Sequence, residues 1–172
     1  PIGSYRSSFY SQALAGALWR RISPLINTIR QFDSHSSTDF DEHRLWRAIG
    51  VSPLFRNIKY EKNGYLIPHY DSAFSYSRTT KTLMSVIIYL TDQQDATGGQ
   101  TRFILDQQRY LPRSERSFRD SMTPVKPRDV LFAVDGLQGS AVVFDHRIRH
   151  DSSVLTSSQA KIILRTDIVF EQ

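Results

Sequence analysis

The sequence predicts a mainly β protein in which N-terminal helices support a jelly-roll core, an α+β arrangement. Two features of the chain predict this fold class. Apolar residues before Phe55 recur at helical spacing. From Phe55 onward, short runs rich in Val, Ile, Phe, Tyr and Thr alternate with turn residues. Many short strands at such spacing favour a sandwich or barrel over parallel βαβ units.

The length and composition indicate one globular domain. With 172 residues, 40% of them hydrophobic and 23% charged, the chain is typical of folded domains. We expect a single domain over 1–172, in which 1–54 form a mostly helical support and 55–172 form the jelly-roll core. The net charge of +5 suits an anionic ligand without naming one. The absence of cysteine excludes disulfides, zinc–thiolate sites and cysteine nucleophiles.

The segment 7–32 carries the helical pattern. Its apolar residues follow the period of a helix: Leu14, Leu18, Ile22, Leu25, Ile26 and Ile29. Ser7 or Ser8 is the expected N-cap, and Pro24 is expected to kink or split the helix. A polar loop over 33–44 follows, and we expect it to lead into a capped helix that runs through Trp46.

The second part of the chain carries the strand pattern. The predicted strands are 55–60, 64–71, 82–90, 101–105, 129–134, 139–146 and 161–170. Residues 106–127 have no clear period, and we expect a long loop there, either solvated or a binding loop or lid. Its arginines could grip an anionic or peptide substrate: Arg109, Arg113, Arg116 and Arg119.

No stretch of the chain predicts a membrane span or a secretion signal. No apolar run approaches the ~20 residues that cross a bilayer. The opening residues contain no apolar signal-peptide core. We therefore expect a cytoplasmic location.

The five histidines divide into two groups. His35 and His43 lie in the polar segment and are expected at the surface. His69 and Asp71 are two residues apart on a predicted strand, so both side chains should point to one face. An imidazole and a carboxylate on one face supply two ligands of a 2-His-1-carboxylate metal site.

A third ligand should come from a distant strand end. The candidates are His146 and His150, in the stretch where a predicted buried strand runs out into a polar turn. The spacing alone would also fit zinc or a purely structural cluster. It indicates a metal site without identifying the metal.

The strand after this turn carries inward-pointing cations. Lys161, Ile163 and Arg165 share one face by period-two alternation. A cation inside a barrel is costly unless it meets an anion, such as the far carboxylate of a dicarboxylate ligand. The alternative is an edge strand on which both cations are solvated.

Several motifs, in this order, closely resemble the iron(II)/2-oxoglutarate-dependent dioxygenases, in particular the prolyl-4-hydroxylase-like branch. They are "KYEKNGYLIPHYD", "VIIYLTD", "GGQTRF", "GSAVVFDHRIRH" and "AKIILRTDIVF". The resemblance covers roughly residues 55–170 and implies a double-stranded β-helix, which is a jelly-roll or cupin-like core. Gln100 departs from the glutamate that many relatives carry in the glycine turn.

The resemblance implies a metal centre with no further catalytic residue. It assigns His69, Asp71 and His150 as Fe(II) ligands, with His146 as the rival to His150. The implied co-substrates are 2-oxoglutarate and O2, and ascorbate is a further candidate cofactor. Related halogenases lack the carboxylate, so the presence of Asp71 favours hydroxylation.

The resemblance also implies a 2-oxoglutarate pocket. Lys161 would pair with the 5-carboxylate of 2-oxoglutarate, although it lies one residue further from His150 than in many hydroxylases of the branch. Arg165 is the rival anchor. Tyr89 matches a tyrosine that hydrogen-bonds the same carboxylate in part of the family, and Tyr60 matches another pocket tyrosine; both could instead be core aromatics.

The implied function is hydroxylation of an aliphatic carbon of a peptidyl or free amino acid, with release of succinate and CO2. We therefore expect a small-molecule or peptide substrate. We do not expect nucleic acid, because no surface of interleaved aromatic and basic residues is evident. The alternatives are an oxidative demethylase of nucleic acids or small molecules, a non-catalytic cupin-like metal-binding module, and a β-sandwich in which His69 and Asp71 only bond each other.

Overall fold

The computed structural model of the chain describes residues 2–26, 29–31, 45–92, 97–108, 111, 115 and 125–172. The predictions for His35 and His43 lie outside the described residues. So do those for the four loop arginines, Arg109, Arg113, Arg116 and Arg119.

The described chain is mainly β, with one α-helix near the N-terminus. The helix α1 spans Gln12–Ile22, and short 3-10 helices follow at Ser23–Leu25 and Pro127–Asp129. The strands are β1 Ile2–Tyr10, β2 Ile29–Gln31, β3 Leu45–Val51, β4 Leu54–His69, β5 Thr80–Tyr89, β6 Thr101–Ile104, β7 Val130–Val134, β8 Ala141–Asp145, β9 His150–Ser152 and β10 Lys161–Glu171. The predicted mainly β class is confirmed.

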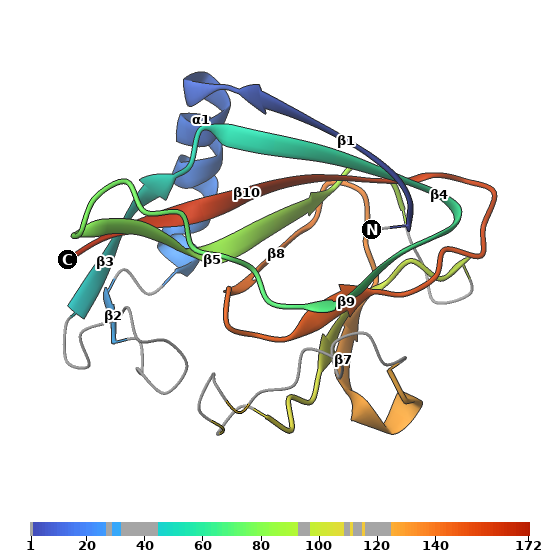
Figure 1. The fold of residues 1–172 in the computed structure, drawn as a ribbon. Helices are drawn as coiled ribbons and strands as arrows, with labels where there is room; N and C mark the ends of the chain where they lie inside the picture. The colour runs from blue at the N-terminus through green and yellow to red at the C-terminus, as the bar shows by residue number, and fades with distance from the viewer. Residues whose placement is uncertain are drawn as a thin grey trace.

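The larger sheet is built around β10. One edge of β10 pairs with β5, which continues to β8. Its other edge pairs first with β4 and then with β3, and β1 adds to the outer side of β4. All these pairings are antiparallel, and Figure 1 shows β4, β10 and β5 running side by side as the long strands of the fold.

A smaller sheet forms where β4 continues past the edge of the larger one. The last residues of β4 pair with β9, which continues to β6 and β7. Because β4 belongs to both sheets, the antiparallel sheet curls over on itself in a jelly-roll-like arrangement (Figure 1). The strand ends that carry the predicted ligands lie in this smaller sheet.

The core consists of two apolar clusters. One contains Ala15 and Ile22 of α1, which pack with strand residues such as Trp46 and Phe55. The second contains Ile58, Tyr60, Tyr89, Phe144 and Ile163, on strands that are neighbours in the larger sheet. Apolar burial on both sides explains why β5 is buried along most of its length.

The prediction that residues 1–54 are mostly helical is wrong for part of this range. Residues 2–10, with the expected caps Ser7 and Ser8, form β1 along β4, and Ser11 is the N-cap, accepting a hydrogen bond from the Leu14 N–H at 3.2 Å. The local pattern alone places these residues in a helix. Pairing with β4 instead gives their backbone N–H and C=O groups hydrogen-bond partners. Pro24 lies in the 3-10 helix after α1, as expected for a residue that interrupts helices.

The predicted helix through Trp46 is also wrong. Residues Leu45–Val51 form β3, in which Trp46 and Ala48 are buried and their neighbours exposed. This alternation of buried and exposed residues is typical of a strand. The predicted helix instead followed from the helix-capping residues in the preceding polar segment. No helix in the described part of the chain is long and apolar enough to cross a membrane.

Two predicted strands, 55–60 and 64–71, are one continuous strand that ends earlier than expected. β4 runs through Asn63, which has a positive φ of 67°, and stops at His69. Asp71 therefore lies just beyond the strand. Its backbone N–H donates to the carbonyl oxygen of His146 at 3.1 Å, which ties the segment to the end of β8.

Candidate functional site

Three side chains form a compact group with the composition of a metal site. His69, Asp71 and His150 each offer a ligand atom, and these atoms lie within 4.8 Å of one another. The two histidines are direct partners on β4 and β9, and their ring centroids are 4.2 Å apart. The Asp71 oxygens face both rings, Oδ1 at 3.7 Å from Nε2 of His69 and Oδ2 at 3.6 Å from Nε2 of His150.

Backbone carbonyls set the tautomer of both histidines. Nδ1 of His69 lies 2.9 Å from the carbonyl oxygen of Ile67, and Nδ1 of His150 lies 2.9 Å from that of Ile148. Since a carbonyl oxygen only accepts, each Nδ1 must carry the proton. Each neutral ring therefore presents the Nε2 lone pair to Asp71, as a metal ligand requires.

Electrostatics keep the two rings neutral. Burial lowers the pKa of His69 below its ordinary value, partly opposed by the charge of Asp71. Burial and then the neighbouring His69 lower the pKa of His150 to about 4, again opposed by Asp71. Neutral imidazole is the form that binds a metal, so no proton competes for these ligands near neutral pH.

His146, the rival to His150, lies outside this group. It is buried, and its Nε2 lies 3.2 Å from Oδ1 of Asp167 instead of near Asp71. The structure brings His150 to His69 and Asp71 because β9 resumes pairing after the turn that follows β8. The strand pattern alone left both histidines open, since both follow the same buried strand, and the family resemblance assigned His150.

A cavity of about 330 Å³ opens beside the three residues. Its wall includes alternate residues of β10, namely Lys161, Ile163 and Arg165, in agreement with the period-two prediction. Tyr60 lines the cavity as well, directly across from Lys161 on β4. The alternative of solvated cations on an edge strand is wrong, because β10 is paired on both sides.

Lys161 is a buried cation without a carboxylate partner among the described residues. Its side chain is 1% exposed, and Nζ donates to the Gly99 carbonyl at 2.5 Å and to Ser152 Oγ at 2.9 Å. Burial lowers the pKa of Lys161 to about 7, opposed by the charge of Asp151. A buried ammonium held only by neutral oxygens can accept an anion from the cavity.

The glycine turn of the "GGQTRF" motif supports Lys161 from behind. Gly98 and Gly99 have positive φ values of 64° and 74°, which favour glycine. This conformation delivers the Gly99 carbonyl to Lys161. Two residues on, Thr101 Oγ1 accepts a hydrogen bond from the Tyr89 hydroxyl at 2.9 Å.

The two predicted pocket tyrosines occupy different positions. Both rings lie under the Lys161 ammonium, with centroids 5.2 Å away for Tyr60 and 6.0 Å for Tyr89. Of the two, Tyr60 lines the cavity. The Tyr89 hydroxyl donates to Thr101, which is itself part of the cavity wall. Burial raises the pKa of each phenol to about 12, so both remain protonated donors.

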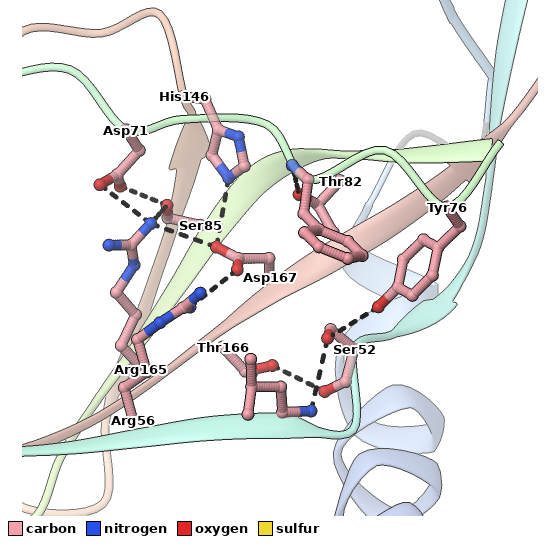
Figure 2. A network of polar contacts seen from close by, with 12 residues as sticks. Ser52, Arg56, Asp71, Tyr76, Thr82, Ser85, His146, Arg165, Thr166 and Asp167 are labelled. Atoms are coloured by element: carbon pink, nitrogen blue, oxygen red, sulfur yellow. Dashed lines mark hydrogen bonds and ion pairs between the residues drawn. The ribbon is translucent and has the colours of Figure 1, made fainter. Parts of the chain in front are cut away.

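Arg165 makes an ion pair inside the site instead of projecting freely. Its Nη2 lies 2.9 Å from Oδ1 of Asp71, and the Ser85 hydroxyl donates to Oδ2 of the same carboxylate. Figure 2 shows Arg165 reaching across the sheet to Asp71, with Asp167 beside it. The carboxylate of the candidate metal group is therefore bonded on both oxygens.

Sequence reasoning missed several residues of this site. Asp167 lies at an alternate position of β10, like Lys161 and Arg165, so period-two alternation could have predicted that it shares their face. Ser85 lies inside an apolar strand and gave no signal. Arg6 lines the cavity from β1, a strand that the sequence did not predict.

The middle residue of the His69–Asp71 stretch also differs from expectation. Period-two alternation along the predicted strand places Tyr70 on the face opposite His69 and Asp71, where it would pack. It lines the cavity instead, and its hydroxyl donates to Asp106. The chain leaves the regular strand at this point, so strict alternation no longer applies.

Comparison with known proteins identifies the family. The profile described as the 2OG-Fe(II) oxygenase superfamily matches residues 55–166. This range contains all three residues of the candidate metal group, together with Tyr60, Lys161 and Arg165. A search of curated proteins found no match.

Solved structures share the fold at low sequence identity. The viral collagen prolyl hydroxylase vCPH from Paramecium Bursaria Chlorella virus-1 is 14% identical, with a TM-score of 0.54 over 99% of this chain and 80% of that one. HygX from Streptomyces hygroscopicus, solved with nickel, 2-oxoglutarate and hygromycin B bound, is 12% identical, with a TM-score of 0.51 over 99% and 70%. The family match spans more than half of the chain, and the protein therefore belongs to the 2OG-Fe(II) oxygenase superfamily, as a 2-oxoglutarate-dependent dioxygenase.

Proposed function

We propose that this dioxygenase hydroxylates an aliphatic carbon of a free or peptidyl amino acid, with His69, Asp71 and His150 as the iron ligands. One observation carries the proposal: the register of β4 with β9 sets two neutral Nε2 atoms against one carboxylate. Two imidazoles and a carboxylate are the ligand set of non-haem Fe(II) oxygenases. The residues therefore fit Fe(II).

Lys161 is proposed to anchor the far carboxylate of 2-oxoglutarate. Its support is a buried ammonium on the cavity wall that has only neutral oxygen partners. Tyr60, whose protonated hydroxyl belongs to the same wall, is proposed as a second donor. Tyr89 is proposed to act indirectly: its hydroxyl bonds Thr101 and its ring packs under the Lys161 ammonium.

The bound iron and 2-oxoglutarate supply dioxygen activation and the decarboxylation to succinate and CO2 that accompanies hydroxylation. The chain's own contribution is geometric. Phe144 and Phe103 pack near the His150 ring, with centroids 4.6 and 6.4 Å away, which shields that ligand from water. His69 is the more open ligand, its side chain 27% exposed, so we propose that substrate approaches from its side.

The cavity wall also bears on the substrate. Of the residues that the structure describes, four cations line it: Arg6, Arg56, Lys161 and Arg165. Arg56 pairs with Asp167, and Arg165 pairs with Asp71 and Asp167. Among the described residues no carboxylate forms an ion pair with Arg6. We propose that Arg6 meets an anionic group of the substrate, such as the carboxylate of a free amino acid.

Anaerobic addition of Fe(II) and 2-oxoglutarate tests the function. We expect a visible charge-transfer band from the wild type, and loss of that band from His69→Ala. Lys161→Met should need far more 2-oxoglutarate to develop it. Lys59→Met, which alters an exposed lysine on β4, is the matched control.

The substrate class is tested separately by mass spectrometry. Amino acids and peptides are incubated with the loaded enzyme and O2, and we expect the gain of one oxygen atom together with succinate. Absence of the charge-transfer band would favour the non-catalytic metal-binding module. Loss of a methyl group instead of a gain of oxygen would favour the demethylase.

A further inference from the structure

A polar network surrounds the carboxylate of the candidate metal group. Asp71 lies beyond the end of β4, so strand pairing does not hold its backbone. Its side chain is only 2% exposed, and both oxygens have a partner: Arg165 Nη2 at 2.9 Å from Oδ1, and the Ser85 hydroxyl at Oδ2. The direction of this carboxylate is therefore set by two side chains of the sheet.

Arg165 is itself held in place. Its Nη2 lies 3.3 Å from Oδ1 of Asp167 and 3.3 Å from Ser85 Oγ. Asp167 is in turn bonded by Nε2 of His146 at 3.2 Å and by Nη1 of Arg56 at 3.1 Å. In Figure 2, His146 and Arg56 reach Asp167 from above and below, while Arg165 continues to Asp71.

Strand register places the central residues of this network side by side. Asp167 of β10 stands directly opposite Ser85 of β5, and Arg165 stands opposite Arg56 of β4. Four members of the network are thus neighbours on three adjacent strands, while Asp71 and His146 lie just beyond strand ends. Burial opposes ionisation of Asp167, but the hydrogen bond from His146 and the charges of Arg165 and Arg56 outweigh it and lower the pKa of Asp167. The partner of Arg165 is therefore a carboxylate at neutral pH.

We propose that Arg165 is a positioning residue for Asp71 and not an anchor for 2-oxoglutarate. The proposal rests on the proposed role of Asp71 as a metal ligand. Arg165 already has two carboxylate partners, whereas Lys161, on the same face of β10, has none among the described residues. The two cations of this strand therefore have separate roles, one toward the metal ligand and one toward the co-substrate.

Removing Arg165 would change the affinity for the metal through two opposing effects. A guanidinium near the site repels a divalent cation, and removing it would strengthen metal binding. The same guanidinium aims the carboxylate, and removing it would weaken metal binding. Asp167, 3.3 Å from the same Nη2, offsets much of the positive charge, so the loss of aim should dominate. Loss of an outer partner of a metal ligand typically lowers metal affinity about 10–100-fold.

The test measures two affinities by calorimetry under nitrogen: Fe(II) alone, and then 2-oxoglutarate at saturating Fe(II). For Arg165→Met we expect a Kd for Fe(II) raised about 10–100-fold and nearly unchanged 2-oxoglutarate binding. Arg165→Lys, which keeps a cation, should recover part of the Fe(II) affinity. Lys161→Met should show the reverse pattern, and Arg128→Met, at an exposed arginine, should change neither.

Circular dichroism establishes that each variant is folded. If Arg165→Met does not fold, Ser85→Ala tests the same carboxylate through its other oxygen and should also weaken Fe(II) binding. Unchanged or tighter Fe(II) binding by a folded Arg165→Met would overturn the proposal, as would loss of 2-oxoglutarate binding with Fe(II) retained. Failure of the wild type to bind Fe(II) would instead overturn the metal assignment, and this proposal with it.

Discussion

His69 and His150 stand directly opposite each other on antiparallel β4 and β9, and each ring donates Nδ1–H to the carbonyl of the residue two positions earlier. Residues 69 and 150 are far apart in sequence, yet each ring makes the same kind of bond to a backbone carbonyl. The pairing of two strands and these backbone bonds therefore direct both Nε2 atoms toward Asp71.

Removing either histidine should greatly weaken metal binding. We expect His150→Ala to lower Fe(II) affinity by more than the roughly 10–100-fold cost of losing an outer partner. His146→Gln, at the rival position, should have a much smaller effect, because the His146 side chain contacts Asp167. The bond of His146 to the Asp71 N–H is made by its backbone carbonyl, which the substitution retains. Anaerobic Fe(II) titration measures both, and a larger loss for His146→Gln would contradict the assignment.

Binding of 2-oxoglutarate should weaken as pH rises above about 7. The pKa of Lys161 in the free protein is about 7, so the amine loses its charge above that pH. A bound dicarboxylate favours the charged form of the Lys161 amine. Above pH 7, binding of 2-oxoglutarate must therefore be accompanied by uptake of a proton. Calorimetry in buffers of different ionisation enthalpy measures this uptake.

Lys161→Met is the matched test of that pH dependence. We expect its 2-oxoglutarate affinity to be about 10–100-fold weaker, because a hydrogen bond to a charged group contributes roughly 1.5–3 kcal/mol. The pH dependence should disappear with the amine. A variant that retained the wild-type pH profile would show that another group titrates.

The metal-free protein should lose stability as pH falls below about 6.5. Both histidines have a pKa lowered in the folded state, that of His150 to about 4, so the unfolded chain binds protons first. Stability is therefore complete above the unfolded pKa of about 6.5 and declines toward pH 4. Urea unfolding across this range measures the effect. A flat profile would contradict it, and His150→Gln should flatten it in part.

Gly136→Ala should weaken 2-oxoglutarate binding indirectly. A Cβ at this position would lie 2.3 Å from Cδ1 of Tyr89, so the ring must move away from its place under Lys161. We expect a stability loss of about 1–3 kcal/mol from overpacking, with Fe(II) affinity retained. Gly50→Ala is the control, because a Cβ there meets nothing within 4 Å. Equal effects of both substitutions would refute the role of Tyr89.

Arg6→Gln should raise the KM of an acidic substrate and leave the affinities for Fe(II) and 2-oxoglutarate unchanged. Arg6 of β1 lies opposite Ile58 of β4, and both residues line the cavity. Comparing each substrate amino acid with its amide tests whether a carboxylate is recognised, since only the acid should respond to the substitution. Arg20→Gln on α1 is the control. An equal response of acid and amide would show that Arg6 does not meet the anion.

Local sequence was sufficient for much of the site. Period-two alternation predicted that Lys161, Ile163 and Arg165 share a face, and the structure confirms it. The order of the motifs led to the family that the profile match shows. These features depend on neighbours in the chain, and so they can be read from it directly.

Tertiary structure decided what depends on distant pairing. Residues 2–10 form a strand only because β4 offers them an edge, and local periodicity contains no information about that partner. The choice of His150 over His146 depends on β9 pairing with β4. The ion pair of Arg165 with Asp71 joins a strand to a segment beyond another strand's end. Sequence therefore determined which residues face inward, and the register between strands decided which of them meet.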